Sequence, residues 1–177
     1  IVSALLQRER TGEGQLVEVA MLETAVMALA SALGAYMDGE SDRVGARTGN
    51  RHPALAMAPY NVYATNDGHV AIFTASERHW HSIVRVLGRE DLLTDPAYAT
   101  TPGRAAKMDE IDALVEAWTR DRSKDDVMAI LTRAHVPCAP VRTTAEVAND
   151  PHLAARGVWQ DLDHPRRGKI RVPRSPI

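Results

Sequence analysis

The chain has 177 residues, of which 45% are hydrophobic and 25% charged, and its formal net charge is −2. These values are typical of a soluble globular protein and give no reason to expect nucleic-acid binding. No apolar run reaches the roughly 18 residues of a membrane span, so we expect no membrane contact. The single cysteine, Cys138, excludes a disulfide framework within the chain and fits a cytoplasmic protein.

The first ten residues, IVSALLQRER, already have a helical rhythm, with no Met or N-cap residue before them. We therefore expect the chain to be a piece of a larger protein, with the apolar side chains of this helix facing inward. Gly12 is expected to cap the helix in the left-handed conformation. Residues 15–20 then predict a strand, and residues 21–37 predict a helix with apolar side chains at three- or four-residue steps.

Residues 38–58 are polar and irregular, which predicts a domain boundary or a functional loop. Two strands are expected after it, over residues 60–65 and 69–75. Asn66, Asp67 and Gly68 would join them as a hairpin, because an Asp-Gly pair tolerates the positive φ of such turns. Ser76 is a plausible N-cap for the helix that follows.

The later elements are indicated by amphipathic periodicity, capping boxes and proline-limited strands. They are an amphipathic helix over residues 104–120, a helix opened by a Ser123–Asp126 capping box, an edge strand over 136–141, a short helix opened by Thr143 and Glu146, and a strand pair over 158–162 and 169–172. The order predicts an α/β segment followed by a compact α+β unit.

The turn, strand and helix over residues 11–24 form the first candidate site. In α/β sheets, ligands gather where a strand ends and a helix N-terminus offers free N–H groups, and Met21 lies at that point. The alternative is structural: Gly12 and Gly14 permit the turn, and Met21 fills a gap. The sequence has no six-residue phosphate fingerprint here, so both interpretations stay open.

Two further candidates follow along the chain. The segment 47–59 combines Asn50, Arg51 and His52 with a flexible backbone, which suits either a substrate flap or a solvated linker. Glu77 lies in the first turn of its helix, where a carboxylate complements the helix dipole by roughly 0.3–1 kcal/mol. Its functional alternative is a buried partner for a catalytic base.

The histidines and the cysteine give no metal site or nucleophile. His79 and His81 lie two residues apart on a helix and point in nearly opposite directions, so they cannot chelate one ion together. No Cys/His spacing indicates zinc. Cys138 lies in an apolar stretch and is expected to be a small core residue. The residues by themselves therefore give no complete catalytic set.

At these same residues the sequence resembles the family III CoA-transferases of the CaiB/BaiF type. This group includes formyl-CoA transferase, carnitine CoA-transferase and α-methylacyl-CoA racemase. The resemblance covers nearly the whole chain in the family's order. It is carried by TGEGQLVEVAM, RTGNRHPALAMAPYNVYATNDGHVAIF, LGREDLLTDPAYATTPGRAA, VPCAPVRTTAEVANDPHLAARG and HPRRGKIRVPRSPI.

The resemblance implies a cytoplasmic, two-domain α/β enzyme that forms an interlocked homodimer. Its substrates would be acyl-CoA and a carboxylic acid, with coenzyme A as the group carried and no metal. Residues 1–46 would end a Rossmann-like CoA-binding domain, residues 47–146 would form a smaller α+β lid domain, and residues 147–177 would return to the large domain.

The resemblance also implies roles for particular residues. The family's nucleophile is an aspartate expected about ten residues before Ile1, so this fragment alone is expected to be inactive. That carboxylate would attack the thioester and carry CoA as an aspartyl-CoA thioester. Met21 would contact CoA. Asn50, Arg51 and His52 would begin the substrate loop, where NRHPALAMAP replaces the glycine run of formyl-CoA transferase.

Two alternatives to the transferase remain. The first is an acyl-CoA racemase, in which Glu77 would orient a catalytic histidine for proton transfer at the α-carbon. The second is an inactive module that serves as a lid and a dimerisation surface. The departure of residues 50–59 from the glycine run and the position of Glu77 keep the racemase open, and the presence or absence of the upstream aspartate would separate the enzymes from the inactive module.

Overall fold

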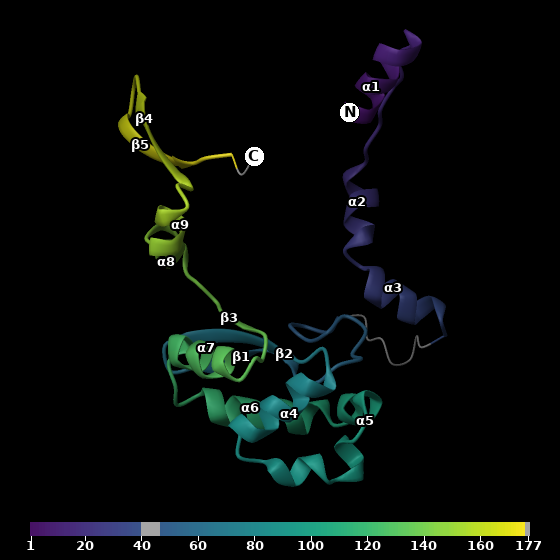
Figure 1. Cartoon of the computed structure of the whole chain (residues 1–177), viewed down its shortest axis with the longest axis vertical. Coiled ribbons are helices and arrows are strands. Elements are labelled where there is room, and N and C mark those ends of the chain that lie inside the picture. Colours follow the sequence, from purple (N-terminus) through teal and green to yellow (C-terminus); the bar gives the residue numbers. More distant parts are fainter. Residues whose placement is uncertain (40–46, 176–177) are drawn as a thin grey trace.

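The computed structural model of the chain describes residues 1–39 and 47–175, arranged as a central unit from which two arms extend (Figure 1). The N-terminal arm consists of α1 (Val2–Thr11), α2 (Met21–Met27) and α3 (Ala30–Met37). The C-terminal arm consists of α8 (Thr144–Ala148), α9 (Pro151–Ala155) and a hairpin of β4 (Trp159–His164) and β5 (Gly168–Pro173). Both arms leave the same side of the central unit.

The central unit is built on a three-stranded antiparallel sheet with the order β1-β2-β3. The strands are β1 (Tyr60–Thr65), β2 (Gly68–Phe73) and β3 (Cys138–Pro140). Thr65 pairs with Gly68 across the turn, which confirms the predicted hairpin, although β2 ends two residues earlier than predicted. β3 lies at an edge, as expected for a strand with Pro140, which has no N–H to donate.

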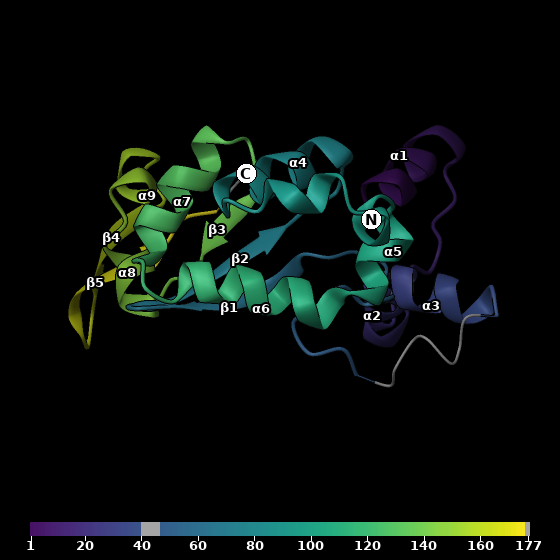
Figure 2. The same ribbon diagram turned by 90° about the horizontal axis from the view of Figure 1, so that it is seen from below.

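Four helices complete this unit: α4 (Glu77–Val86), α5 (Thr101–Ala106), α6 (Met108–Thr119) and α7 (Lys124–Arg133). Two 3-10 turns, Glu90–Leu93 and Pro96–Tyr98, connect α4 to α5. α6 packs along β1, and α7 packs against β2 and β3. Figure 2 shows α6 running along β1 when the molecule is seen from below.

The hydrophobic core lies within this unit. Among the described residues, every buried hydrophobic side chain falls between Ala54 and Val136. Val70 of β2, Val115 of α6 and Leu131 of α7 have no exposed surface. The sequence pattern explains this, because their neighbours on the same face of each strand or helix are also apolar. The mixture of helices and strands confirms the α/β class. The division at residues 46 and 146 stays a prediction.

Several local signals are confirmed. Gly12 caps α1 with φ 77°, and Ser76 and Ser123 accept N-cap bonds from His79 N–H and Asp126 N–H. The reciprocal capping box of Thr143 and Glu146 opens α8. Each of these caps is formed by groups within four residues of one another along the chain, so it depends little on tertiary packing.

Other predictions were wrong. Residues 15–20 form no strand, because no other strand of the described chain pairs with them. The helix predicted over residues 21–37 breaks near Ala28 into α2 and α3, neither of which has a buried residue. The apolar side chains of α1 do not face inward, since Leu5 and Leu6 are exposed. The helix predicted over residues 104–120 begins at Thr101 and breaks at Lys107 into α5 and α6.

The irregular segment was predicted correctly where the structure describes it. Residues 47–58 contain turns and bends without a helix or strand, while residues 40–46 of that prediction lie outside the described residues. In the described ranges, no helix is long and apolar enough to cross a membrane.

Candidate functional site

The segment that precedes β1 is tied to its neighbours by its side chains. The Arg51 guanidinium donates from Nε to Asp112 Oδ2 at 2.8 Å and from Nη2 to Asp109 Oδ1 at 2.7 Å. The His52 ring accepts a bond from Ala54 N–H and meets the Tyr60 ring edge-on at 5.2 Å. Residues 50–59, which we call the substrate loop after the role that the resemblance implies, therefore have side-chain contacts with α6 and β1, while that role stays a prediction.

The backbone of the substrate loop turns sharply at Leu55. Its N–H donates to the His52 carbonyl at 2.8 Å, and its φ is 49°, in the left-handed region that side chains other than glycine rarely adopt. The end of the loop is hydrogen-bonded to the residue that follows β2, because Thr74 N–H donates to the Pro59 carbonyl at 2.9 Å. The loop thus lies next to the junction of β2 and α4.

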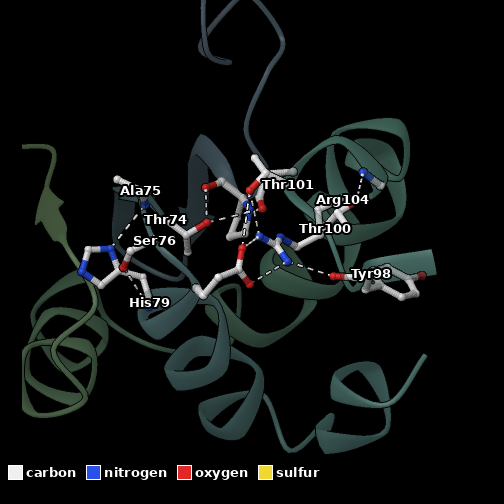
Figure 3. A network of polar contacts seen from close by, with 12 residues as sticks. Thr74, Ala75, Ser76, His79, Tyr98, Thr100, Thr101 and Arg104 are labelled. Atoms are coloured by element: carbon white, nitrogen blue, oxygen red, sulfur yellow. Dashed lines mark hydrogen bonds and ion pairs between the residues drawn. The ribbon is translucent and has the colours of Figure 1, made fainter. Parts of the chain in front are cut away.

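At this junction, Glu77 forms an ion pair with Arg104 of α5. Arg104 Nη1 donates to Glu77 Oε2 at 3.1 Å, and Arg104 Nη2 donates to Glu77 Oε1. The same guanidinium donates to the Tyr98 carbonyl and to Thr101 Oγ1, and it lies 5.2 Å from the Trp80 ring (Figure 3). Arg104 is only 3% exposed, so these contacts satisfy a buried charge.

The charge of Glu77 is stabilised by this contact. The hydrogen bond from Arg104 lowers the pKa of Glu77 below its ordinary value of 4.5, against the opposing effect of burial. The carboxyl group is therefore ionised at neutral pH. Since both of its oxygens already accept bonds from Arg104, Glu77 joins α4 to α5 in addition to complementing the helix dipole.

Two cavities lie beside the substrate loop and α5. The smaller, of about 100 Å³, lies where the loop meets the β2–α4 junction. Its walls are formed by Met57, Ala58, Thr74, Ala75, Ser76, Thr101 and Arg104. The larger, of about 310 Å³, is lined mainly by apolar side chains and has the Arg51–Asp109 ion pair at its rim. The apolar walls are Leu55, Pro102, Ala105, Ala106 and Met108. Only the larger reaches the roughly 300 Å³ of ordinary small-molecule sites.

The structure brings some predicted site residues together and separates others. Asn50, Arg51 and His52 open the loop, and Glu77 follows the strand to which the loop is bonded. Met21 lies at the start of α2 in the N-terminal arm, with 89% of its surface exposed, apart from the central unit (Figure 1). Its predicted contact with CoA stays a prediction. No group of three or more metal-ligating side chains occurs in residues 1–39 and 47–175.

Sequence reasoning missed two residues of this site, Arg104 and Asp112. Asp112 lies one position after Ile111 and three before Val115, on the apolar face of the predicted helix. A carboxylate at such a position indicates a buried partner, and this signal could have been read. Arg104 gave no comparable signal, because its partners Glu77 and Tyr98 come from other elements.

The comparisons with known proteins agree with one another. The model of "CoA-transferase family III" matches residues 1–177. Succinyl-CoA:mesaconate CoA-transferase of Haloarcula hispanica is 35% identical, and the match covers 100% of this chain and 43% of that protein. Formyl-CoA:oxalate CoA-transferase of Rhodopseudomonas palustris is 32% identical, with 100% of this chain and 46% of that protein covered.

Solved structures show the same fold. A CaiB/BaiF family protein from Brucella suis is 30% identical with a TM-score of 0.65, covering 99% of this chain and 48% of that one. Rv3272 from M. tuberculosis is 23% identical with a TM-score of 0.76, covering 99% of this chain and 44% of that one, and it supports the fold alone. The chain thus spans less than half the length of these relatives. With the family model matched from the first residue to the last, the chain belongs to CoA-transferase family III.

Proposed function

We propose that this chain is part of an enzyme that moves CoA between an acyl-CoA thioester and a carboxylic acid. The observation that carries the proposal is the match to the transferase family along all 177 residues. The relatives agree, because their names describe CoA transfer between an acyl-CoA and a dicarboxylic acid such as mesaconate or oxalate.

In this proposal the nucleophile is an aspartate outside residues 1–177. It attacks the thioester carbonyl, which forms a mixed anhydride and releases CoA thiolate. The thiolate then attacks the aspartyl carbonyl, which forms an aspartyl-CoA thioester and releases the donor carboxylate. The acceptor acid repeats these steps in reverse. A covalent intermediate replaces one difficult exchange with several easier ones. The 177-residue chain by itself is accordingly expected not to turn over substrate.

The described residues have supporting roles in the proposal. Met21 contacts CoA, for which its exposed and polarisable thioether is suited. The substrate loop, beginning at Asn50, Arg51 and His52, forms a fixed wall beside the reacting groups. Glu77 and Arg104 hold the neighbouring helices in place.

We also propose that the N-terminal arm is covered in the whole protein, either by a second copy of the chain in a homodimer or by a further part of the same protein. Its large apolar side chains are exposed in the described structure; Leu16, Val19 and Leu22, for example, are all more than 70% exposed. Exposure of so many large apolar side chains along one segment is uncommon in monomers and is typical of segments that bind another chain or another part of the protein.

One experiment tests the transferase against its two alternatives. The full-length protein is incubated in deuterated water with succinyl-, formyl-, acetyl- and a 2-methylacyl-CoA and with mesaconate or oxalate, and protein and ligands are analysed by mass spectrometry. A CoA adduct on an aspartyl peptide upstream of Ile1, without deuterium at the α-carbon, is the expected result. Deuterium at the α-carbon without an adduct would establish the racemase, and neither signal would favour the inactive module.

A further inference from the structure

Asp112 of α6 is a buried carboxylate that is hydrogen-bonded by three different side chains. It is 8% exposed, and it accepts bonds from Arg51 Nε at 2.8 Å, Asn61 Nδ2 at 3.0 Å and Tyr63 Oη at 2.7 Å. Arg51 Nη2 lies 2.7 Å from the same Oδ2 atom. Oδ2 is shared by Arg51 and Asn61, Oδ1 accepts from Tyr63, and the residue is almost fully buried, so Asp112 is engaged by its protein partners and presents little surface to a substrate.

The donors around Asp112 come from two segments of the chain. Asn61 and Tyr63 lie two residues apart on β1 and so project from the same face of the sheet, toward α6. Burial and the charge of Asp112 raise the pKa of Tyr63, so its hydroxyl remains a donor at neutral pH. Asp112 is thus fixed to the sheet by two donors, and its third partner, Arg51, belongs to the substrate loop.

The Arg51 guanidinium donates hydrogen bonds to the carboxylates of Asp109 and Asp112. Burial opposes its charge, but the bonds to Asp109 and Asp112 outweigh that effect and raise the pKa of Arg51. The group of one guanidinium and two carboxylates carries a net charge of −1, which disfavours the binding of a substrate carboxylate at Arg51. The side chain therefore acts on the loop and not on the substrate.

The loop that Arg51 holds borders both cavities. Leu55 lines the larger one, and Met57 and Ala58 line the smaller one. Leu55 has a left-handed backbone, a conformation that persists only where the surroundings determine it. The bonds from Arg51 to α6, four residues before Leu55, provide such a constraint on the loop backbone.

We infer that Asp112 is a positioning residue of the proposed transferase, which aligns the substrate loop through Arg51 without touching substrate. This inference rests on the proposed function. Because transfer depends on the alignment of the reacting groups, a loop that shifts by about 1 Å is expected to slow the chemical step by roughly 10- to 100-fold.

The test compares Asp112→Asn and Arg51→Gln with Glu116→Gln in the full-length protein. Glu116 lies on the same helix and pairs with Arg120 in an exposed i,i+4 contact, so it provides a matched loss of one carboxylate. Single-turnover CoA transfer and amide hydrogen exchange are measured for each protein. Arg51→Gln leaves Asp112 with both of its β1 donors, which keeps the test valid if Asp112→Asn does not fold.

We expect Asp112→Asn and Arg51→Gln to lower the single-turnover rate constant at least tenfold with full amplitude. Exchange within residues 51–58 should rise at least tenfold, while Glu116→Gln changes neither quantity. The double variant should be no slower than Asp112→Asn, because both changes break the same link.

Two results would overturn the inference: a lower amplitude with an unchanged rate constant, which marks a purely structural defect, or unchanged exchange in residues 51–58. If the wild-type protein transfers no CoA, the proposed function fails, and with it the catalytic half of this inference. The exchange data would then still decide whether Asp112 anchors the loop.

Discussion

Arg104 is buried in the central unit, yet the carboxylate with which it pairs, that of Glu77, has a side chain that is 56% exposed. The pair therefore joins the interior to the surface at the start of α4. The buried partner cannot be solvated if the pair is broken, whereas the exposed partner can. The two ends of this ion pair should respond differently to substitution.

Glu77→Gln is expected to lower the free energy of unfolding by about 1–2 kcal/mol, because it removes the charged acceptor of a buried guanidinium, while the Tyr98 carbonyl and Thr101 Oγ1 still accept bonds from it. Urea denaturation measures this change. The matched control is Glu9→Gln, which breaks the exposed Arg8–Glu9 pair and should change stability by less than about 0.5 kcal/mol. Equal effects of the two substitutions would contradict the structural role of the Glu77–Arg104 pair.

Glu146 should make stability depend on pH in the acid range. Hydrogen bonds, first from Lys124 and then from Thr143, lower the pKa of Glu146 from 4.5 to about 2. Since the folded-state pKa is the lower one, the stabilisation is fully present above pH 4.5 and is lost as the pH falls toward 2.

Unfolding measured at several pH values between 6 and 2.5 checks this prediction. The stability of wild type should fall more steeply below pH 4.5 than that of Glu146→Gln, so that the two curves converge on acidification. Parallel curves would show that the contact between Lys124 and Glu146 does not form in solution.

Leu131 of α7 has no exposed surface, so Leu131→Ala should destabilise the central unit by about 2–5 kcal/mol through lost burial and the cavity left behind. Leu22→Ala is the control, because Leu22 is 76% exposed in α2 and should cost less than about 0.5 kcal/mol in the 177-residue chain. Thermal unfolding of both variants distinguishes them. A large cost for Leu22→Ala in the full-length protein would support the proposal that the N-terminal arm is covered there.

Cys138 should react slowly in the folded protein. It is half-buried at the edge of the sheet, and burial raises the pKa of its thiol above the ordinary value. Because the thiolate is the reactive form, a thiol reagent at pH 8 should label the native chain at least about tenfold more slowly than the chain unfolded in urea. Cys138 is the single cysteine of the 177 residues, so all of the labelling reports on this thiol. Equal rates in the two states would contradict the half-buried position of this thiol.

The elements that the sequence predicted well are those with local causes. The hairpin of β1 and β2 follows from the Asn66-Asp67-Gly68 turn between two short segments rich in apolar residues, and α4 and α7 follow from their caps and periodic apolar faces. The strand predicted over residues 15–20 was wrong, because a strand requires a partner strand, which a local pattern cannot supply.

The candidate site divides in the same way. The sequence by itself determined the family, since the motifs that carry the resemblance are continuous strings, and it predicted candidate site residues at Asn50–His52 and Glu77. Only the tertiary structure decided what these side chains bind. Arg51 and Asp112 are 61 residues apart, and Glu77 and Arg104 are 27 apart. Which charge neutralises which depends on how α5 and α6 pack beside β1 and α4, and the spacing of residues along the chain does not encode that packing.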